Sequence, residues 1–477
     1  MKISFNKINK TGFTLVNLYE KDIDIKNNIC SEKNTEKFLN IKSEFKLTDE
    51  MNQRTFLMLI RKVILKAKAE KIQKLSLDYN QIRKIQTEVL DKISEKQNAA
   101  DFDSAWTAKT VIENIFLAAY KFEKYKSQKE NSLEEVLIFG EFSKIEKENF
   151  QKGEIVGKAA NIARELANTP ANDMTPTILA QETKNIFKNY PKVKIKILEE
   201  ADVKKIGMNL FLAVGAGSQH PSKFIICEYL AGQKNARPIV LIGKGITYDT
   251  GGLNLKPGSS MNSMIMDMTG GAVILATLKA VADLKIPKNI IVLVPAVENA
   301  ISGEAYRPGD IIKSLEGITV EIDNTDAEGR LILADAITYA KKYNPKYLLD
   351  VATLTGAAVV ALGEYATVIL SKENDLSEKV SKLSESTGDL TWPLPMWNLY
   401  KDYLKSKTAD ILNLSTSRWG GTISAALFLY EFVSKIPDVK WMHFDIAPRM
   451  TANENDNLES GATGEPVRLL VELISEL

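Results

Sequence analysis

Two nearly continuous apolar runs, Pro238–Ile246 and Asn289–Val297, constrain the fold of this chain more than any other feature. A strand with one face in water alternates apolar and polar residues, whereas a strand covered by helices on both faces is apolar throughout. Between the two runs, Gly270–Leu284 has the apolar content and spacing of a crossover helix. This order predicts a mostly parallel central sheet flanked by helices, with any site at the carboxyl ends of its strands.

The same alternation of strand and helix continues to the end of the chain. The later predicted strands are Ile318–Ile322, Tyr347–Val351 and Trp441–Ile446, and the later predicted helices are Leu331–Tyr343 and Thr422–Val433. We therefore expect residues 171–477 to form one large α/β domain.

The first 150 residues predict a smaller α/β domain. Its expected strands are Gly12–Tyr19, Lys74–Tyr79 and Glu135–Gly140, and helical patterns occupy about 50–70 and 101–120. A helical stretch over about 144–168 follows and stops at Asn168-Thr-Pro-Ala-Asn. We expect this helix to link the two domains, and 477 residues suit two or three domains at roughly 150 residues each.

The charge balance argues against nucleic acid as the main partner, because 62 Lys and Arg nearly cancel 61 Asp and Glu. One stretch, Arg54–Lys84, is basic, and we interpret it as a solvated helix face. The alternative is a DNA-binding role, for which this stretch is the only support in the sequence. A salt-dependent gel shift would test that role. The two cysteines, Cys30 and Cys227, suit a reducing compartment. The start lacks a signal sequence and no apolar run is long enough for a membrane helix, so we expect a cytoplasmic protein with no membrane partner.

Histidine is scarce, since the chain has only His220 and His443. This excludes an HExxH protease and any metal site that needs three imidazoles. We interpret both histidines as structural. Any bound metal must therefore be held mainly by oxygen ligands.

Charged side chains gather where the predicted strands end. They are Lys244, Asp249, Lys256, Asp267, Asp326, Glu328 and Arg330. A parallel sheet brings consecutive strand-to-helix loops to one edge, and four carboxylates close together are unfavourable unless a cation lies among them. Helix capping would account for one aspartate but not for the whole set. The pattern therefore predicts a metal site.

Other catalytic motifs do not fit. Gly243-Lys-Gly-Ile-Thr-Tyr lacks the third glycine of a dinucleotide-binding loop, and it also lacks the upstream glycine and the Ser/Thr of a phosphate loop. No GxSxG nucleophile elbow is present.

The sequence resembles the leucine aminopeptidases, or cytosol aminopeptidases, a family of two-metal exopeptidases. The resemblance covers roughly residues 150–477. Its most specific part is Asn324-Thr-Asp-Ala-Glu-Gly-Arg330, followed by Leu-Ile-Leu-Ala-Asp. Gly243-Lys-Gly-Ile-Thr, Asp249-Thr-Gly-Gly and Asp350-Val-Ala-Thr-Leu-Thr-Gly356 also match, whereas Tyr248 and Thr250 stand where Phe and Ser are common in the family. The first 150 residues carry no such motif.

The resemblance implies a metal-dependent aminopeptidase that releases N-terminal residues by attack of a hydroxide bridging two metals. One metal would be bound by Lys244, Asp249, Asp267 and Glu328, and the second by Asp249, Asp326 and Glu328. The ions would be Zn²⁺ or Mn²⁺, with Mg²⁺ or Co²⁺ as alternatives. Lys256 would stabilise charge on the substrate carbonyl, and Arg330 would hold a bicarbonate ion that moves the proton.

The resemblance also implies a pocket for the first substrate residue. Its positions are Met264, Thr353, Leu354, Gly356, Ala447 and Met450, and an apolar pocket of this kind favours Leu- or Met-like residues. The family further implies a homohexamer, a dimer of trimers, acting on peptides. A catalytically inactive scaffold is the remaining alternative, but every expected metal and catalytic position carries the expected residue type.

Overall fold

The computed structural model describes residues 1–7, 10, 12–17, 38–40, 53–93, 103–128 and 133–477. Contacts divide these residues into two compact units: Met1–Lys158 with Asn453–Ser460, and Ala159–Ala452 with Gly461–Leu477. The division falls inside helix α4 (Lys144–Asn168). The last two residues of the expected strand Gly12–Tyr19, the first residues of the two helical patterns and Cys30 lie outside the described residues.

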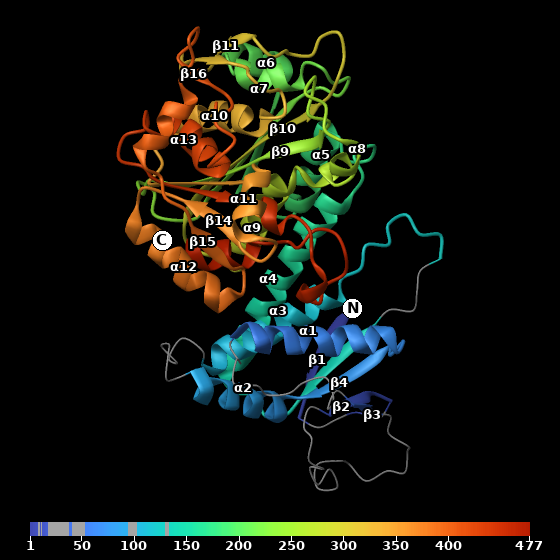
Figure 1. Ribbon diagram of the computed structural model, residues 1–477. Helices are drawn as coiled ribbons and strands as arrows, with labels where there is room; N and C mark the ends of the chain where they lie inside the picture. Colours follow the sequence, from blue (N-terminus) through green and yellow to red (C-terminus); the bar gives the residue numbers. More distant parts are fainter. Residues whose placement is uncertain (8–9, 11, 18–37, 41–52, 94–102, 129–132) are drawn as a thin grey trace. The chain divides into compact units, whose positions relative to one another are not determined.

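Within the first unit, the described residues form a five-stranded sheet in which every pair of neighbouring strands is parallel, in the order β1-β5-β4-β2-β3. The strands are β1 (Lys2–Asn6), β2 (Thr14–Asn17), β3 (Phe38–Asn40), β4 (Lys74–Asp78) and β5 (Glu135–Phe139). Its helices are α1 (Gln53–Ala69), α2 (Tyr79–Ile93) and α3 (Ser104–Ala119) (Figure 1). Strands β1 and β3 and helix α2 were not expected from the sequence, although Tyr79, Ile82 and Ile85 of α2 are buried at a spacing of three.

The short segment Asn453–Ser460 belongs to the first unit through contacts with α1. The buried guanidinium of Arg61 donates to the carbonyl oxygen of Asp456 at 2.9 Å and to the side chain of Asn114 at 2.7 Å. Lys68 pairs with Glu459 at 3.0 Å. These residues come from the basic stretch Arg54–Lys84, so part of its charge is used in contacts within this unit.

The second unit is built on a nine-stranded sheet, counted over residues 133–477, which the structure describes without a gap. The order is β15-β14-β17-β13-β8-β10-β7-β6, with β9 also paired to β10. The strands are β6 (Val193–Glu199), β7 (Lys223–Leu230), β8 (Ile239–Gly243), β9 (Gly245–Asp249), β10 (Asn289–Asn299), β13 (Tyr347–Ala352), β14 (Thr367–Leu370), β15 (Thr391–Pro393) and β17 (Lys440–Asp445). The central strands β17, β13, β8, β10 and β9 are parallel, whereas β14, β7 and β6 pair antiparallel. The predicted α/β class, with a parallel centre, is confirmed.

Helices cover the large sheet on both faces (Figure 1). Helix α9 (Thr269–Asp283) packs on β8, β10 and β13, and α14 (Val467–Glu476) packs on α9. On the other face, α10 (Glu328–Ala340) lies between α7 (Asn209–Gly215) and α13 (Gly421–Val433). The remaining helices of this unit are α5 (Pro176–Phe187), α6 (Glu200–Ile206), α8 (Gly258–Met261), α11 (Gly356–Leu362) and α12 (Asn374–Thr387), with short 3-10 turns η3 (Met264–Met266), η4 (Lys341–Tyr343), η5 (Asn398–Leu404), η6 (Ala447–Arg449) and η7 (Glu454–Asp456, in the first unit).

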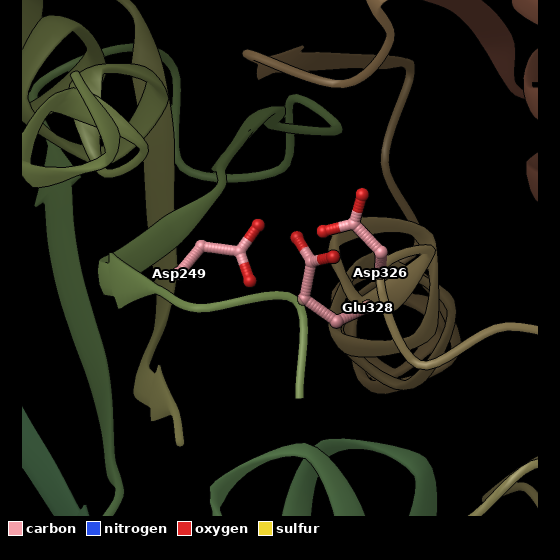
Figure 2. Close-up of side chains that lie close together, drawn as sticks. All are labelled: Asp249, Asp326 and Glu328. Atoms are coloured by element: carbon pink, nitrogen blue, oxygen red, sulfur yellow. The ribbon is translucent and has the colours of Figure 1, made fainter. Parts of the chain in front are cut away.

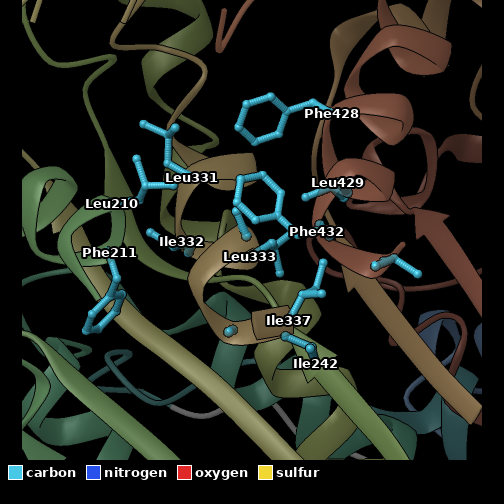
Figure 3. Close-up of a cluster of buried hydrophobic side chains, with 14 of the residues drawn as sticks. Leu210, Phe211, Ile242, Leu331, Ile332, Leu333, Ile337, Phe428, Leu429 and Phe432 are labelled. Atoms are coloured by element: carbon cyan, nitrogen blue, oxygen red, sulfur yellow. The ribbon is translucent and has the colours of Figure 1, made fainter. Parts of the chain in front are cut away.

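The core beneath α10 fixes the position of that helix against the sheet. Figure 3 shows Leu331, Ile337 and Phe432 packed together with Ile242 of β8. Each is fully buried, and burying such side chains contributes about 1.5–3 kcal/mol apiece. The first turn of α10 is thereby held close to the ends of the central strands.

Helix α9 lies in the stretch Gly258–Asp283, which among the described residues is long and apolar enough to cross a membrane. Its most apolar window is 83% buried inside the protein, however, so its composition is that of a core helix.

The strand that precedes Asp326 and Glu328 differs from the expectation. Strand β12 (Thr319–Glu321) is not part of the large sheet but pairs with β11 (Ile311–Lys313) and β16 (Ile411–Leu412) in a small sheet of its own. The expectation that the large sheet carries Asp326 and Glu328 to its edge is therefore wrong. The packing of α10 brings them there instead.

Candidate active site

The break between β8 and β9 places Lys244 at the centre of the sheet. Both strands pair with β10, and Lys244 lies between them. Its N–H donates to the carbonyl of Val351 at 3.0 Å, and its carbonyl accepts from Gly271 at 2.8 Å. A Cβ atom on Gly270 would lie 2.1 Å from the carbonyl oxygen of Val351, so only glycine lets α9 begin this close to the strands.

Asp249 ends β9, and its side chain is held by two hydrogen bonds. Its Oδ1 accepts from the backbone N–H of Gly251 at 2.9 Å and from the side-chain amide of Asn299 at 2.8 Å. Asn299 ends β10 and also donates to the carbonyl of Thr325 at 3.1 Å. The carboxylate of Asp249 is therefore fixed before any ligand binds.

The turn before α10 and the first residue of that helix supply two further carboxylates of the centre, Asp326 and Glu328. The backbone N–H of Asp326 donates to the side chain of Asn324 at 2.7 Å, which forms a tight turn before the helix. Helix α10 then begins at Glu328, three residues earlier than the predicted Leu331. Glu328 and Arg330 therefore lie in the first helical turn, where the partial positive charge of the helix N-terminus favours a carboxylate.

Three carboxylates from these elements point toward one another, as Figure 2 shows for Asp249, Asp326 and Glu328. One oxygen from each lies within 4.8 Å of the others. Burial and the neighbouring charge of Asp249 raise the pKa of Glu328 to about 8, and the same two causes raise the pKa of Asp326. Such a cluster is unfavourable for anions and favourable for a divalent cation.

Lys244 and Asp267 adjoin this cluster. The Nζ of Lys244 lies 2.8 Å from both Asp267 and Glu328. Burial alone would lower the pKa of Lys244, but the charges of these two carboxylates outweigh it and raise that pKa. Burial raises the pKa of Asp267 to about 6, although Lys244 opposes this. The hydroxyl of Thr353 donates to Asp267 at 2.7 Å and orients it.

Two further cations lie at the same site. The Nζ of Lys256 lies 2.9 Å from Asp249 and 2.5 Å from Asp326, so it forms ion pairs on the outer side of the carboxylates. Arg330 is only 5% exposed, and its Nε and Nη1 have no hydrogen-bond partner among the described residues. Burial lowers its pKa to about 10, which leaves the guanidinium charged at neutral pH. Its unpaired donors suit an anion.

A single cavity of about 440 Å³ joins these groups. All the site residues predicted from the sequence line it: Lys244, Asp249, Lys256, Met264, Asp267, Asp326, Glu328, Arg330, Thr353, Leu354, Gly356, Ala447 and Met450. Neither histidine does. His443 is fully buried, with its Nδ1 2.5 Å from a carboxylate oxygen of Asp350. The individual roles of the lining residues remain predictions.

Sequence reasoning missed the polar residues that hold the loops of the site in place. Besides Asn299, they are Tyr306, Asn413 and Asp445. Tyr306 donates to the carbonyl of Thr325 at 2.7 Å, and Asn413 bonds the loop at Asn324. Asp445 accepts from the backbone of Leu354 and the hydroxyl of Thr355. The bond of Tyr306 spans 19 residues and those of Asn413 and Asp445 about 90, so no local pattern identifies these residues. The position of Asp445 at the end of a central strand was nevertheless a usable signal.

The donor set fits divalent metal ions. Four carboxylates and one lysine converge, and oxygen-rich sets of this kind bind Zn²⁺, Mn²⁺, Mg²⁺ or Co²⁺. Burial raises the pKa of both Glu328 and Asp267, so it is costly to keep the two carboxylates ionised without a nearby cation. Coordination by Lys244 requires the loss of its proton, which a divalent ion among the same carboxylates would favour.

Comparisons with known proteins agree with this chemistry. Residues 161–471 match the model of the cytosol aminopeptidase family, catalytic domain. A probable cytosol aminopeptidase of Nitrosococcus oceani is 42% identical over 77% of this chain and 73% of its own length. The cytosol aminopeptidase of Haemophilus influenzae is 39% identical over 81% of this chain and 78% of its own.

A solved structure is similar over the whole chain. The bottromycin maturation enzyme BotP in complex with Mn has a TM-score of 0.80 and 28% sequence identity, covering 99% of this chain and 98% of its own. The matching family model, the curated relatives and the carboxylate cluster lead to one conclusion: this chain belongs to the cytosol aminopeptidase family and is a metal-dependent aminopeptidase.

Proposed function

We propose that this enzyme releases N-terminal residues, preferentially Leu- or Met-like ones, from peptides by attack of an activated water. The observation that carries the proposal is the convergence of Asp249, Asp326 and Glu328 within 4.8 Å in a cavity that holds every other expected residue. Two divalent ions bound there would supply Lewis acidity and lower the pKa of water toward neutrality.

The residues of the chain then have separate tasks. Asp249, Asp326 and Glu328 would hold the metal ions, and Lys244 with Asp267 would complete one of the two sites. Lys256, whose ammonium group lies at the outer side of Asp249 and Asp326, would stabilise negative charge that develops on the substrate carbonyl oxygen. Arg330 would hold a small anion such as bicarbonate close to the reacting bond, because its Nε and Nη1 are unpaired among the described residues.

The proposed substrate preference rests on the apolar part of the cavity. Met264, Ala447 and Met450 line it, and apolar side chains of this kind suit a Leu- or Met-like first residue. Discrimination should be modest, since one methylene group contributes about 1–3 kcal/mol. Replacing Met450 by Ala should therefore lower kcat/KM for leucyl substrates more than for alanyl substrates.

The decisive experiment measures hydrolysis of leucyl-p-nitroanilide by protein loaded with Mn²⁺, by chelator-treated protein and by a Glu328→Ala variant. N-acetyl-leucyl-p-nitroanilide tests the need for a free amino group. Glu304→Ala, at an exposed glutamate outside the cavity, is the matched control. Activity that needs metal, Glu328 and the free amine supports the proposal. No turnover by a folded sample loaded with Mn²⁺, Zn²⁺, Mg²⁺ or Co²⁺ would refute it and favour the inactive-scaffold alternative.

We further propose a cytoplasmic homohexamer, which light scattering would detect at six times the 53.1 kDa chain mass. DNA binding stays a prediction to be tested by gel shift. Within the basic stretch, Arg54, Arg61, Lys68 and Arg83 make polar contacts inside the first unit, and this favours the structural interpretation of their charge.

A further inference from the structure

Arg418 is a cation at the cavity that the metal chemistry does not use. Four cations line the cavity, and two of them, Lys244 and Lys256, pair with carboxylates of the metal site. Arg330 is buried beside the same carboxylates. Arg418 is exposed, and among the residues that the structure describes it has no acidic partner. It therefore presents a free guanidinium to whatever enters the cavity.

The Arg418 side chain is held by its neighbour. Its guanidinium carbon lies 4.6 Å from the ring centroid of Trp419, a cation–π contact that leaves the N–H groups available. Trp419 itself is 69% exposed, so the stacked pair stands at the open side of the cavity and not in the core. A guanidinium fixed in this way recognises a carboxylate by two parallel hydrogen bonds better than a mobile lysine does.

The backbone that carries Arg418 is tied to the metal-site loop. Asn413, fully buried, accepts from the backbone N–H of Asp323 at 2.8 Å and donates to the carbonyl of Asn324 at 2.7 Å. Thr416 donates to the carbonyl of Tyr403 at 2.9 Å. The segment that leads to Arg418 is thus held at Asn413 against the loop that bears Asp326 and at Thr416 against Tyr403. A specificity residue needs such a supported backbone.

The direction in which the peptide chain runs through the cavity determines which substrate group reaches Arg418. An aminopeptidase holds the free amino group at the metal centre, and the chain beyond the scissile bond must leave through the open side of the cavity. Each residue beyond that bond extends the chain by at most about 3.6 Å. A carboxylate one or two residues downstream is therefore the anion that reaches the rim first.

We propose that Arg418 is a specificity residue that binds a carboxylate on the leaving side of the substrate, either the free α-carboxylate of a di- or tripeptide or an acidic side chain. This inference rests on the proposed function, since it assumes that the amino group lies at the metal site. If the anion is the α-carboxylate, the enzyme favours short peptides over long or amidated ones; if it is a side chain, the enzyme favours peptides with an acidic residue just beyond the scissile bond.

The test uses two pairs of substrates. Leucyl-glycine against leucyl-glycinamide tests the α-carboxylate. The α-amide of leucyl-aspartic acid against leucyl-asparaginamide tests the side-chain carboxylate. The measured quantity is the ratio of kcat/KM for the acid to that for its neutral partner. Arg418→Gln should lower this ratio about tenfold, equivalent to about 1.4 kcal/mol, mainly through KM. Arg418→Lys should retain part of the preference, and added salt should weaken it in the wild type but not in Arg418→Gln.

Lys407→Gln is the matched control, because Lys407 is an exposed cation of the same region that does not line the cavity. Binding of D-leucyl-glycine and D-leucyl-glycinamide, measured by calorimetry on Mn²⁺-loaded protein, gives the same ratio without turnover. Tighter binding of the acid than of the amide that depends on Arg418 supports the inference, even if no substrate is cleaved. A lack of cleavage would count against the proposed function alone. Equal ratios in the wild type and Arg418→Gln would overturn the inference.

Discussion

The side-chain amide of Asn299 donates to Asp249 at 2.8 Å and to the carbonyl of Thr325 at 3.1 Å. One fully buried side chain thereby joins the strand that carries Asp249 to the loop that carries Asp326. Partners that orient the ligands of a metal commonly matter almost as much as the ligands themselves. Asn299 thus links two carboxylates of the proposed metal centre without facing the substrate.

The first prediction concerns this link. Asn299→Ala should weaken Mn²⁺ binding about 10- to 100-fold, because Asp249 loses one of its two fixed donors. Calorimetric titration of metal-free protein with Mn²⁺ measures the effect directly. Asn185→Ala, on the exposed surface of α5, should leave the affinity unchanged. If Asn299→Ala binds Mn²⁺ as tightly as the wild type, the amide has no part in orienting Asp249.

A second prediction follows from the close approach of Gly329 to Lys244. A Cβ atom at Gly329 would lie 2.7 Å from the Nζ of Lys244 and 2.8 Å from its Cε. These atoms end a flexible side chain, so Lys244 can move away, and alanine is otherwise favourable in a helix by about 1 kcal/mol. Gly329→Ala should therefore keep the wild-type melting temperature while losing at least about tenfold in Mn²⁺ affinity and in kcat/KM.

The control for Gly329→Ala is Gly303→Ala, where nothing lies within 4 Å of the added methyl group. Gly270→Ala is the opposite comparison, because its methyl would collide with the backbone at Val351 and should destabilise the fold. Thermal unfolding and metal titration of all three variants separate the two effects. A Gly329→Ala protein with normal metal affinity would show that Lys244 need not stay where the structure places it.

The sequence predicted the central strands, α9 and the residues of the cavity because these are encoded locally. Continuous apolar runs mark β8 and β10, and the charged residues stand at the strand ends and beside α10. The small sheet of β11, β12 and β16 was not predictable in this way. Strand β16 has two residues and pairs with β12 about ninety positions earlier, so no local pattern reveals it.

Buried polar residues were the other failure of sequence reasoning. Asn299 and Asn413 are fully buried, yet an asparagine in a sequence most often indicates a turn or an exposed position. Their function arises only when distant segments meet and backbone groups need partners. A sequence therefore shows which residues can do the chemistry more readily than which residues hold them in place.

A third prediction concerns the pH dependence of stability. Asp335 of α10 is fully buried, and it accepts from the backbone N–H groups of Phe211 at 3.0 Å and Leu315 at 2.9 Å. Burial raises its pKa to about 7 despite these bonds. A raised carboxyl pKa means that the folded state binds the proton more tightly than the unfolded state does. The stability from Asp335 is thus full below about pH 4 and is lost as the pH rises to about 7.

Between pH 5 and pH 8 this loss should be on the order of 2–3 kcal/mol in the free energy of unfolding. Asp335→Asn cannot ionise, so its stability relative to the wild type should improve across that interval. Urea unfolding of both proteins in chelator, at several pH values, gives the difference and cancels the other titrating groups. If the free energies of unfolding of the two proteins changed in parallel with pH, the backbone donors would keep Asp335 ionised throughout.

The fourth prediction is that the metal centre lowers stability when it holds no metal. Burial and Asp249 together outweigh the attraction of Lys244 and raise the pKa of Glu328 to about 8. The stability from this carboxyl group therefore falls as the pH rises from its ordinary pKa of about 4.5 to about 8, and the loss is complete above that pH. In chelator at pH 8.5, Glu328→Gln should therefore melt a few degrees above the wild type. Saturating Mn²⁺ should reverse the order, since a ligand that binds only the folded state stabilises it. Glu304→Gln should follow the wild type in both conditions. If Glu328→Gln instead melts below the wild type in chelator, the ion pair with Lys244 is the larger contribution, and the carboxylates need no cation to be stable together.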